Sequence, residues 1–367
     1  MDCKHFGLCG SCNNYEGGYE AQLQRKLQQN QKRFAEFYTK KIIPFESPLE
    51  HYRARAEFRI WHEDEKSFYA MTSSQKEPFR VEECPQVNSY IDKLMPLLLK
   101  KLQTDILRNK LFGCDFLSSS DGDIVVSLLY HKKLDGTWEE LAKNVADELD
   151  ISIIGRSRKQ KIVIGKDYVL ESLHVNSKKF VYKHIENSFT QPNPAVNAKM
   201  IAWTLENLED SKSDLLELYC GAGNFTIPFA NYFRKVLATE ISKSSIAAAK
   251  ENMLYNNIEN IEFVRMGVEE FTQALDGVRI FNRMKHINIK EYNLQTVFVD
   301  PPRAGMDEKS CNFTTRFDKI IYISCNPVTL HRDLEILTKT HRVTDMALFD
   351  QFPYTNHVEM GVKLQRR

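Results

Sequence analysis

The sequence predicts an α/β protein in two parts: a C-terminal domain on a mostly parallel, Rossmann-like sheet, and an N-terminal α+β domain. The second half alternates short apolar runs with helix-like runs, which is typical of parallel strands joined by right-handed crossovers. The first half shows no such regular alternation. A chain of 367 residues is also long enough for two domains. We place them at 1–180 and 181–367, joined within the segment 172–183.

In the C-terminal domain, the predicted strands end in turns or prolines at regular intervals. They are 214–219, 235–241, 261–266, 296–300, 319–324, 342–349 and 357–364. Helices are expected over 224–233, 242–257 and 327–340. Ser242 is a favourable N-cap for the second of these, and Pro327 suits the first turn of the third.

In the N-terminal domain, the segment 52–62 (YRARAEFRIWH) alternates polar and apolar residues as a half-buried strand does. Further strands are expected over 111–117, 124–131 and 151–164, and helices over 20–39, 90–103 and 137–149.

Composition excludes several classes of protein. The chain is 42% apolar and 27% charged, which is typical of globular proteins and not of disordered ones. It lacks a run of about 18 apolar residues, so no membrane span is expected, and MDCKHFGLCGSC does not resemble a secretory signal. We therefore expect a cytoplasmic protein with reduced cysteines. The net charge of +1 neither indicates nor excludes a nucleic-acid partner.

The segment ELYCGAGNF (217–225) ends one predicted strand and begins a helix, which is where open α/β sheets bind nucleotides. Gly221 and Gly223 allow close approach of the backbone to a ligand. Glu240, at the end of the next strand, has the right place to accept hydrogen bonds from ribose hydroxyls. The short Gly-x-Gly turn suits S-adenosylmethionine better than a dinucleotide, because it offers no cradle for a pyrophosphate.

Three later motifs each carry one residue with chemical potential. Asp300 lies in VDPPR, where two prolines fix a loop after a strand. Cys325 lies in ISCNP, next to the start of a helix whose N-terminus should lower the pKa of the thiol. Glu359 lies in NHVEM. Taken singly, each also has a structural explanation: DPPR as a strand stop, Cys325 as a buried structural cysteine, and Glu359 as a solvated strand residue.

In this order, GAGN, DPPR, SCNP and HVEM resemble the RNA uridine C5-methyltransferase family, and NSFTQPN (187–193) and LFDQFPYTNHVE resemble its bacterial tRNA branch. The resemblance extends from about Tyr15 to the C-terminus. It implies a Rossmann-like methyltransferase domain that uses S-adenosylmethionine to make 5-methyluridine at position 54 in the T loop of tRNA. It implies Cys325 as the nucleophile that adds to uracil carbon 6 and Glu359 as the base that removes the carbon 5 proton. The implied cofactor contacts are Gln191, Tyr219, Asn224, Glu240 and Asp300.

The same resemblance implies an RNA partner, with neither membrane nor DNA expected. Phe112 matches a position proposed to stack on RNA, and Arg303 in DPPR is placed to orient the substrate. Arg59 shares a strand face with Arg53 and Arg55. With these, the segment 156–161 (RSRKQK) supplies further candidate phosphate contacts.

The N-terminus departs from the tRNA branch. Cys3, Cys9 and Cys12 have the spacing C-x5-C-x2-C, and Cys84 precedes a proline. In ribosomal-RNA relatives this pattern binds a [4Fe–4S] cluster, so the resemblance implies a cluster here, with zinc or no metal as the alternatives. Two other functions also stay open: a ribosomal-RNA uridine C5-methyltransferase, and a non-catalytic RNA-binding module.

Overall fold

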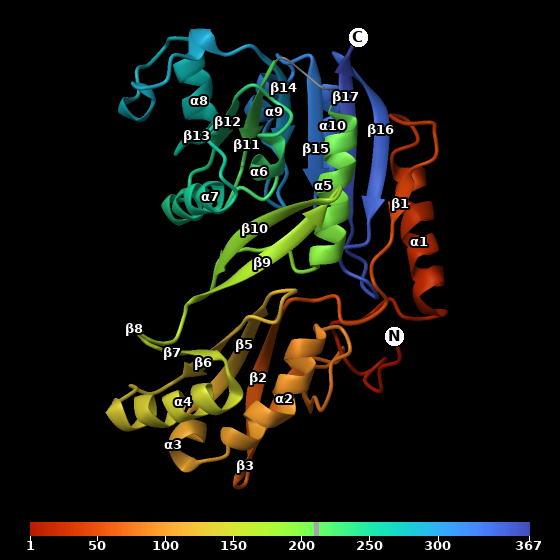
Figure 1. Ribbon diagram of the computed structural model, residues 1–367. Helices are drawn as coiled ribbons and strands as arrows, with labels where there is room; N and C mark the ends of the chain where they lie inside the picture. The colour runs from red at the N-terminus through yellow and green to blue at the C-terminus, as the bar shows by residue number, and fades with distance from the viewer. Residues whose placement is uncertain (209–212) are drawn as a thin grey trace.

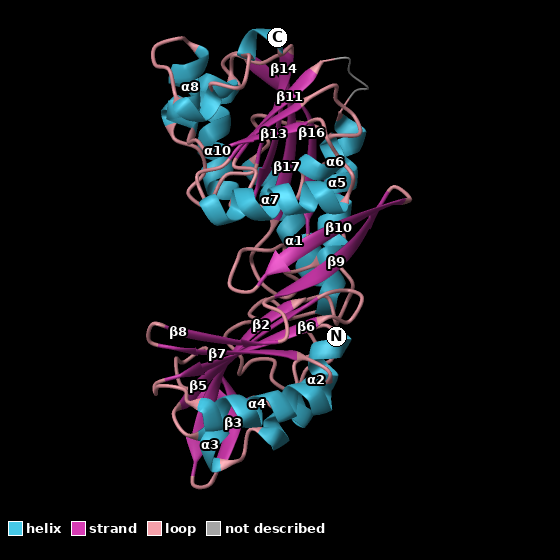
Figure 2. Ribbon diagram, turned by 60° about the vertical axis from the view of Figure 1, so that its left-hand side comes forward, coloured by secondary structure: helices cyan, strands magenta, loops and turns pink. Residues whose placement is uncertain are grey.

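The computed structural model describes residues 1–208 and 213–367. It contains two bodies, each built on one large sheet, with a two-stranded hairpin between them (Figures 1 and 2). The first body carries an eight-stranded sheet in the order β1-β16-β17-β15-β14-β11-β12-β13. All its neighbours are parallel except β17, which is antiparallel to both β15 and β16. This confirms the predicted α/β class and its mostly parallel sheet.

The elements of the eight-stranded sheet come from both ends of the chain. Its strands are β1 (Ile43–Phe45), β11 (Asp214–Leu218), β12 (Val236–Thr239), β13 (Ile261–Val264), β14 (Leu294–Val299), β15 (Lys319–Ser324), β16 (His341–Phe349) and β17 (Glu359–Arg366). Its helices are α1 (Gly18–Arg33), α5 (Pro194–Asn207), α6 (Thr226–Phe229), α7 (Lys243–Tyr255), α8 (Val268–Leu275), α9 (Glu308–Thr314) and α10 (Pro327–Leu337), with short 3-10 turns at Asn282–Met284 and Ile289–Glu291.

Helices cover both faces of this sheet, so the central strands are apolar on both sides. In β11, Leu215 packs in the core beneath α5, α6 and α7. Leu216 and Leu218 belong to the core on the other face, beneath α1, α8, α9 and α10. Burial on both faces is why the predicted strands read as nearly continuous apolar runs.

The second body carries a seven-stranded sheet in the order β4-β3-β2-β5-β6-β7-β8. Its strands are β2 (Arg55–Glu63), β3 (Lys66–Thr72), β4 (Pro78–Arg80), β5 (Leu111–Ser118), β6 (Ile124–Tyr130), β7 (Ser152–Ser157) and β8 (Gln160–Ile164). Helices α2 (Ser89–Lys101), α3 (Asp105–Arg108) and α4 (Gly136–Leu149) lie on one face (Figure 2). Side chains on the opposite face of β2, such as Arg59 and Trp61, are exposed.

Helix α1 and strand β1 belong to the first body, whereas Cys9, ahead of them, bridges Ser73 of the second. Leu23 and Leu27 of α1 pack into the core of the eight-stranded sheet, and β1 pairs with β16. A buried ion pair joins Lys26 of α1 to Asp350, after β16, at 2.6 Å. Helix α1 and strand β1 thus pack on the C-terminal domain before the chain builds the seven-stranded sheet and returns, so the two bodies do not divide at a single point in the sequence.

The hairpin of β9 (Tyr168–Val175) and β10 (Lys178–Ile185) fills the segment where we expected the junction. It packs on the first body through Asn252 of α7, whose Oδ1 accepts from the Lys183 amide at 2.7 Å. Glu186 follows the hairpin and accepts from Nε of Arg156, in β7, at 2.7 Å. The hairpin and this ion pair hold the two bodies together.

Most predicted elements occur near their expected places, and two differ for local reasons. The strand predicted over 151–164 is a hairpin, β7 and β8, turned at Lys159, which has a φ of 60°. The helix predicted over 224–233 shortens to α6. No helix in 1–208 or 213–367 is long and apolar enough to cross a bilayer.

Candidate active site

The predicted catalytic and cofactor residues lie at the carboxyl edge of the eight-stranded sheet. Asp300 follows β14, Cys325 follows β15, and Tyr219 follows β11, three neighbouring parallel strands. Glu240 follows the next strand, β12. Parallel strands end at one edge, so four residues spread over more than a hundred positions of the sequence meet there.

Glu359 reaches the same edge by a different route, because it is the first residue of an antiparallel strand. In the pairing of β15 with β17, Ser324 is opposite Met360. One residue further along the two strands, Cys325 comes opposite Glu359. The nucleophile and the base that the sequence predicts are therefore brought together by strand register.

A cavity of about 600 Å³ opens at this edge. Its lining includes the residues predicted for catalysis, for cofactor binding and for orienting the substrate. They are Gln191, Tyr219, Asn224, Glu240, Asp300, Arg303, Cys325 and Glu359. Gly221 adds an open stretch of backbone, since a Cβ built on it would meet nothing within 4 Å. One continuous cavity can thus hold a cofactor at the glycine turn and a substrate nucleobase beside Cys325.

The glycine turn is conformationally strained. Tyr219 has a φ of 62°, a left-handed conformation that costs energy for a bulky residue, and Gly221 and Gly223 also have positive φ. Both Glu240 carboxylate oxygens accept from backbone N–H groups: Oε2 from Gly221 at 3.1 Å and Oε1 from Ser242 at 2.8 Å. These contacts fix the carboxylate, and each oxygen keeps a second lone pair for a ribose hydroxyl.

Two predicted cofactor contacts have amide partners of their own. Asn224 exchanges two hydrogen bonds with Asn197 of α5, at 2.8 and 2.9 Å. Gln191, before α5, accepts through Oε1 from Nε2 of Gln351 at 2.7 Å. In each pair, the remaining amide hydrogens and lone pairs are the groups left for a ligand.

Carboxyl groups give the cavity its electrostatic character. Burial, and then the nearby charge of Asp300, raises the pKa of Glu359 well above its usual range. Burial raises the pKa of Asp300 to about 7. Glu217, at the base of the turn, is also buried with a raised pKa, and its Oε2 has no hydrogen-bond partner among the described residues. A cavity with three such carboxyls favours a cationic ligand.

The expected pKa of Cys325 is wrong in direction. The thiol is half-buried, and burial, followed by the charges of Glu359 and Asp300, raises its pKa to about 11. Arg303 and the local backbone act in the lowering direction but do not outweigh these causes. The sequence argument considered only the start of α10 and could not include carboxyls delivered by other strands.

The loop of DPPR is tied to the start of α10. The Arg303 carbonyl accepts from Nδ2 of Asn326, the N-cap of α10, at 3.0 Å, and Thr329 also donates to it. Asp333 of α10 accepts from the Met306 amide at 2.9 Å and from the Tyr322 hydroxyl at 2.7 Å. These bonds couple the position of Asp300 and Arg303 to that of Cys325.

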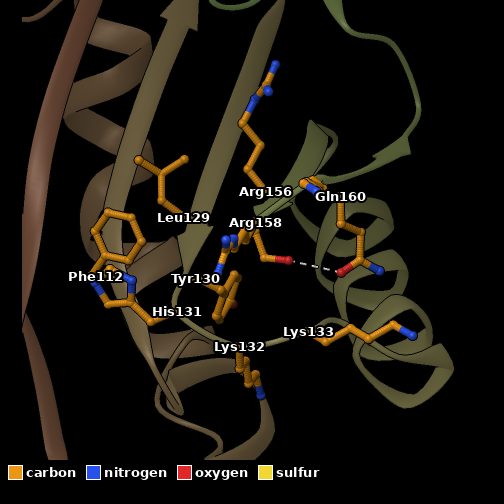
Figure 3. A pocket seen from close by; sticks show the side chains of 11 residues that line it. Phe112, Leu129, Tyr130, His131, Lys132, Lys133, Arg156, Arg158 and Gln160 are labelled. Atoms are coloured by element: carbon orange, nitrogen blue, oxygen red, sulfur yellow. Dashed lines mark hydrogen bonds between the residues drawn. The ribbon is translucent and has the colours of Figure 1, made fainter.

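Phe112 lies on the other body, in a separate cleft of about 750 Å³ (Figure 3). It sits at a bulge in β5, which turns its ring outward, and it stacks on His131 with ring centroids 3.9 Å apart. We call this the basic cleft, because its lining also includes Lys132, Lys133, Arg156, Arg158 and Lys159.

The predicted phosphate contacts divide into two groups. Arg59, Arg158 and Lys159 are exposed. The others make structural contacts: Arg55 donates to the Ser188 carbonyl, Arg53 to the Arg55 carbonyl, Arg156 pairs with Glu186 and Lys161 with Asp167. Sequence alternation placed only Arg53, Arg55 and Arg59 on one face, and it could not separate exposed cations from those with structural partners.

The N-terminal cysteines come together without forming a metal site. The charges of Cys3 and Cys9 act to raise the pKa values of the Cys12 and Cys84 thiols, so the four side chains lie close enough to interact electrostatically. Within the described ranges, however, no three or more His, Cys, Asp or Glu side chains are placed to hold a metal ion. The Gln86 amide contacts the Cys12 sulfur. The structure therefore gives the predicted [4Fe–4S] cluster no support.

Several lining residues were not predicted from the sequence. They are Tyr182, His184, Glu217, Ser245 and Asn252. Gln351, which contacts Gln191 from outside the lining, was not predicted either. Glu217 and Gln351 lay within segments that the sequence singled out, ELYCGAGNF and LFDQFPYTNHVE, but neither was given a role. The hairpin residues Tyr182 and His184 reach the cavity through tertiary packing, for which a single sequence carries no signal.

The fold and the cavity define a methyltransferase of the S-adenosylmethionine-dependent, Rossmann-like class. The chain belongs to the tRNA (uracil-5-)-methyltransferase family, whose model matches residues 18–367. It is 62% identical to the tRNA/tmRNA (uracil-C(5))-methyltransferase of Sulfurimonas denitrificans, with both chains covered in full. It is 49% identical to the enzyme of the same name from Vibrio vulnificus strain YJ016, over 95% of this chain and 97% of that one.

A solved structure supports the fold. The Pyrococcus abyssi tRNA (uracil-54, C5)-methyltransferase in complex with S-adenosyl-L-homocysteine superposes with a TM-score of 0.74 at 20% identity. The match covers 97% of this chain and 84% of the archaeal one. The family and the fold class predicted from the motifs are thus confirmed.

Proposed function

We propose that the protein transfers the methyl group of S-adenosylmethionine to carbon 5 of uridine 54 in the T loop of tRNA, through a covalent Cys325–carbon 6 adduct. The observation that carries the proposal is the meeting of Cys325, Glu359, Asp300 and the glycine turn in one cavity. Relatives named for both tRNA and tmRNA support tmRNA as a second substrate.

The residues present fit S-adenosylmethionine. Glu240 would hold the ribose, and Tyr219, Asn224 and Gln191 would complete the contacts. The unpartnered oxygen of Glu217 and the carboxyl of Asp300 would face the cationic part of the molecule. When bound, S-adenosylmethionine supplies a methyl group activated by a positively charged sulfonium.

Cys325 begins the reaction on the target base. Uracil carbon 5 is a poor nucleophile until a thiolate adds to carbon 6. The addition forms an enolate, whose electron pair is shared between its oxygen and carbon 5. The thiol must first lose its proton, and its raised pKa makes this step depend on the charges in the cavity. Carbon 5 then forms a bond to the methyl group, whose bond to the sulfonium sulfur breaks, and the electron pair of that bond stays on sulfur.

Glu359 completes the reaction. As a carboxylate it removes the proton from carbon 5, the carbon 5–carbon 6 double bond forms again, and Cys325 leaves as thiolate. A buried carboxyl with a raised pKa is a stronger base when ionised, which suits abstraction from carbon. Arg303 and Asp300 would orient the edge of the uracil.

The target uridine must leave its loop to reach Cys325. The exposed ring of Phe112 and the cations Arg59, Arg158 and Lys159 form the proposed RNA-contacting surface, on the body that lacks the catalytic motifs. We propose that this surface recognises the folded shape of the RNA.

The decisive experiment traps the adduct. Glu359→Gln, incubated with unmodified tRNA and S-adenosylmethionine, should accumulate a covalent protein–RNA complex on a denaturing gel. Glu308→Gln, at an exposed site on α9, is the control and should turn over without accumulation. Cys325→Ala should give neither adduct nor product while still binding tRNA. Normal turnover by Cys325→Ala, or methylation mapped to another nucleotide, would contradict the proposal.

For the N-terminal cysteines, the [4Fe–4S] cluster stays a hypothesis that rests on the spacing of Cys3, Cys9, Cys12 and Cys84. Protein purified without oxygen should then carry about four irons per chain and absorb near 400 nm. Cys84→Ser should abolish both. Anaerobic protein that is colourless and free of iron and zinc would refute a metal role.

A further inference from the structure

We propose that Gln351 is a positioning residue that orients the Gln191 amide toward the cofactor cavity, and that α1 holds Gln351 in place. The inference rests on the proposed function, because it concerns the same cofactor site. Gln351 is 1% exposed, and its Nε2 donates to Oε1 of Gln191 at 2.7 Å. Gln191 lines the cavity, whereas Gln351 does not.

The contact holds the Gln191 amide in place with its oxygen on Gln351, whose own Oε1 is buried without a hydrogen-bond partner among the described residues. The end of a glutamine side chain rotates freely, so an unpartnered amide presents either its oxygen or its nitrogen. Here the oxygen is engaged by Gln351, and the N–H donors are left for a ligand. Glu217, Asp300 and Glu359 supply acceptor oxygens to the cavity wall, so a fixed donor at Gln191 would serve an acceptor oxygen of the bound cofactor.

The residues on both sides of Gln351 are anchored to one buried helix face. Lys26 of α1 donates to Asp350 Oδ1 at 2.6 Å and to the Phe352 carbonyl at 3.0 Å. Gln22, one turn earlier, donates to Asp350 Oδ2 at 2.7 Å.

The backbone is tied as well, because the Asp350 amide donates to the Phe45 carbonyl of β1 at 3.0 Å. Gln22, Lys26 and Asp350 are each at most 2% exposed. Such a buried, paired ion is costly to move, which makes it a firm support for the intervening glutamine.

The test is a double-mutant cycle read as S-adenosylhomocysteine affinity by calorimetry. Gln351→Met keeps the size of the side chain and removes its donor. It should weaken binding about tenfold, the cost of one well-placed hydrogen bond. Gln191→Met should weaken binding at least as much, and the double variant should be no weaker than Gln191→Met alone. Melting temperature and tRNA affinity should stay at the parent values, which a merely structural role would not predict.

Gln295→Met, the same change at an exposed site on β14, is the matched control and should bind as the parent does. Parent-like binding by Gln351→Met, or additive losses in the double variant, would overturn the inference. If Gln351→Met does not fold, Gln351→Asn, whose amide is too short to reach Gln191, replaces it with the same expectations. A failure of the proposed function would instead appear in the parent, as no methyl transfer to tRNA.

Discussion

The reactivity of Cys325 offers a direct measurement of the electrostatics of the cavity. Its pKa is raised to about 11. At pH 8 about 0.1% of such a thiol is ionised, against about a quarter for an ordinary cysteine of pKa ~8.5. The more basic thiolate is intrinsically more nucleophilic by roughly tenfold over this range of pKa. Together these effects predict alkylation by iodoacetamide roughly twentyfold slower than for a free cysteine at pH 8.

The assay follows the peptide that contains Cys325 by mass spectrometry, from pH 7 to pH 10.5. The shape of the profile decides the matter, because restricted access lowers the rate at every pH without changing that shape. The rate should rise about tenfold per pH unit up to pH ~10.5, where an ordinary thiol already levels off above pH ~9. A profile that levels off below pH 9 would show that the start of α10 outweighs burial and the carboxyls.

Asp300→Asn tests the cause of the shift. The charge of Asp300 is among those that raise the pKa of Cys325, so its removal should lower that pKa and speed alkylation at pH 8. Asparagine has nearly the size of aspartate, so access to the thiol should not change. Asp121→Asn, at an exposed site on the other body, is the control. Equal rates in the parent and in Asp300→Asn would remove Asp300 from the explanation.

Three further outcomes are expected. Asp300 is neutral below its pKa of about 7 and ionised above it. The preference for cationic S-adenosylmethionine over neutral S-adenosylhomocysteine, measured by calorimetry, should therefore grow roughly tenfold from pH 6 to pH 8. In Asp300→Asn this preference should not change with pH. Lys26→Met leaves the Asp350 charge buried and should cost about 3–5 kcal/mol of unfolding free energy in urea, most of it recovered by adding Asp350→Asn. Phe112→Ala should weaken tRNA binding by about 1–3 kcal/mol in a filter assay and leave the melting temperature unchanged.

The parts of the site that could be predicted from sequence are those that depend on one strand and the turn after it. The glycine turn, Asp300 and Cys325 each follow an apolar run, and a parallel sheet brings such ends together by construction. Glu240 was found by the same logic. These residues required no knowledge of which helix packs on which face.

The rest depends on contacts between distant segments. Gln351 and Lys26 are separated by 325 positions, and no local pattern marks their connection through Asp350. The pKa of Cys325 depends on Glu359 and Asp300, from two other strands. The hairpin β9–β10 was predicted only as a junction. Burial alternates along β9, but one of its buried positions is Glu171, so the apolar pattern of the sequence is interrupted there.

The reversal of the chain at β17 explains why one short loop can serve two roles. A parallel final strand would begin at the opposite edge of the sheet and leave Glu359 far from Cys325. Because β17 is antiparallel to β15 and β16, the loop between β16 and β17 stays at the carboxyl edge. That loop begins with Asp350 and Gln351 and ends next to Glu359. The proposed base and the support of Gln191 therefore belong to one segment, so a shift of α1 that moves Asp350 would disturb both cofactor binding and proton removal.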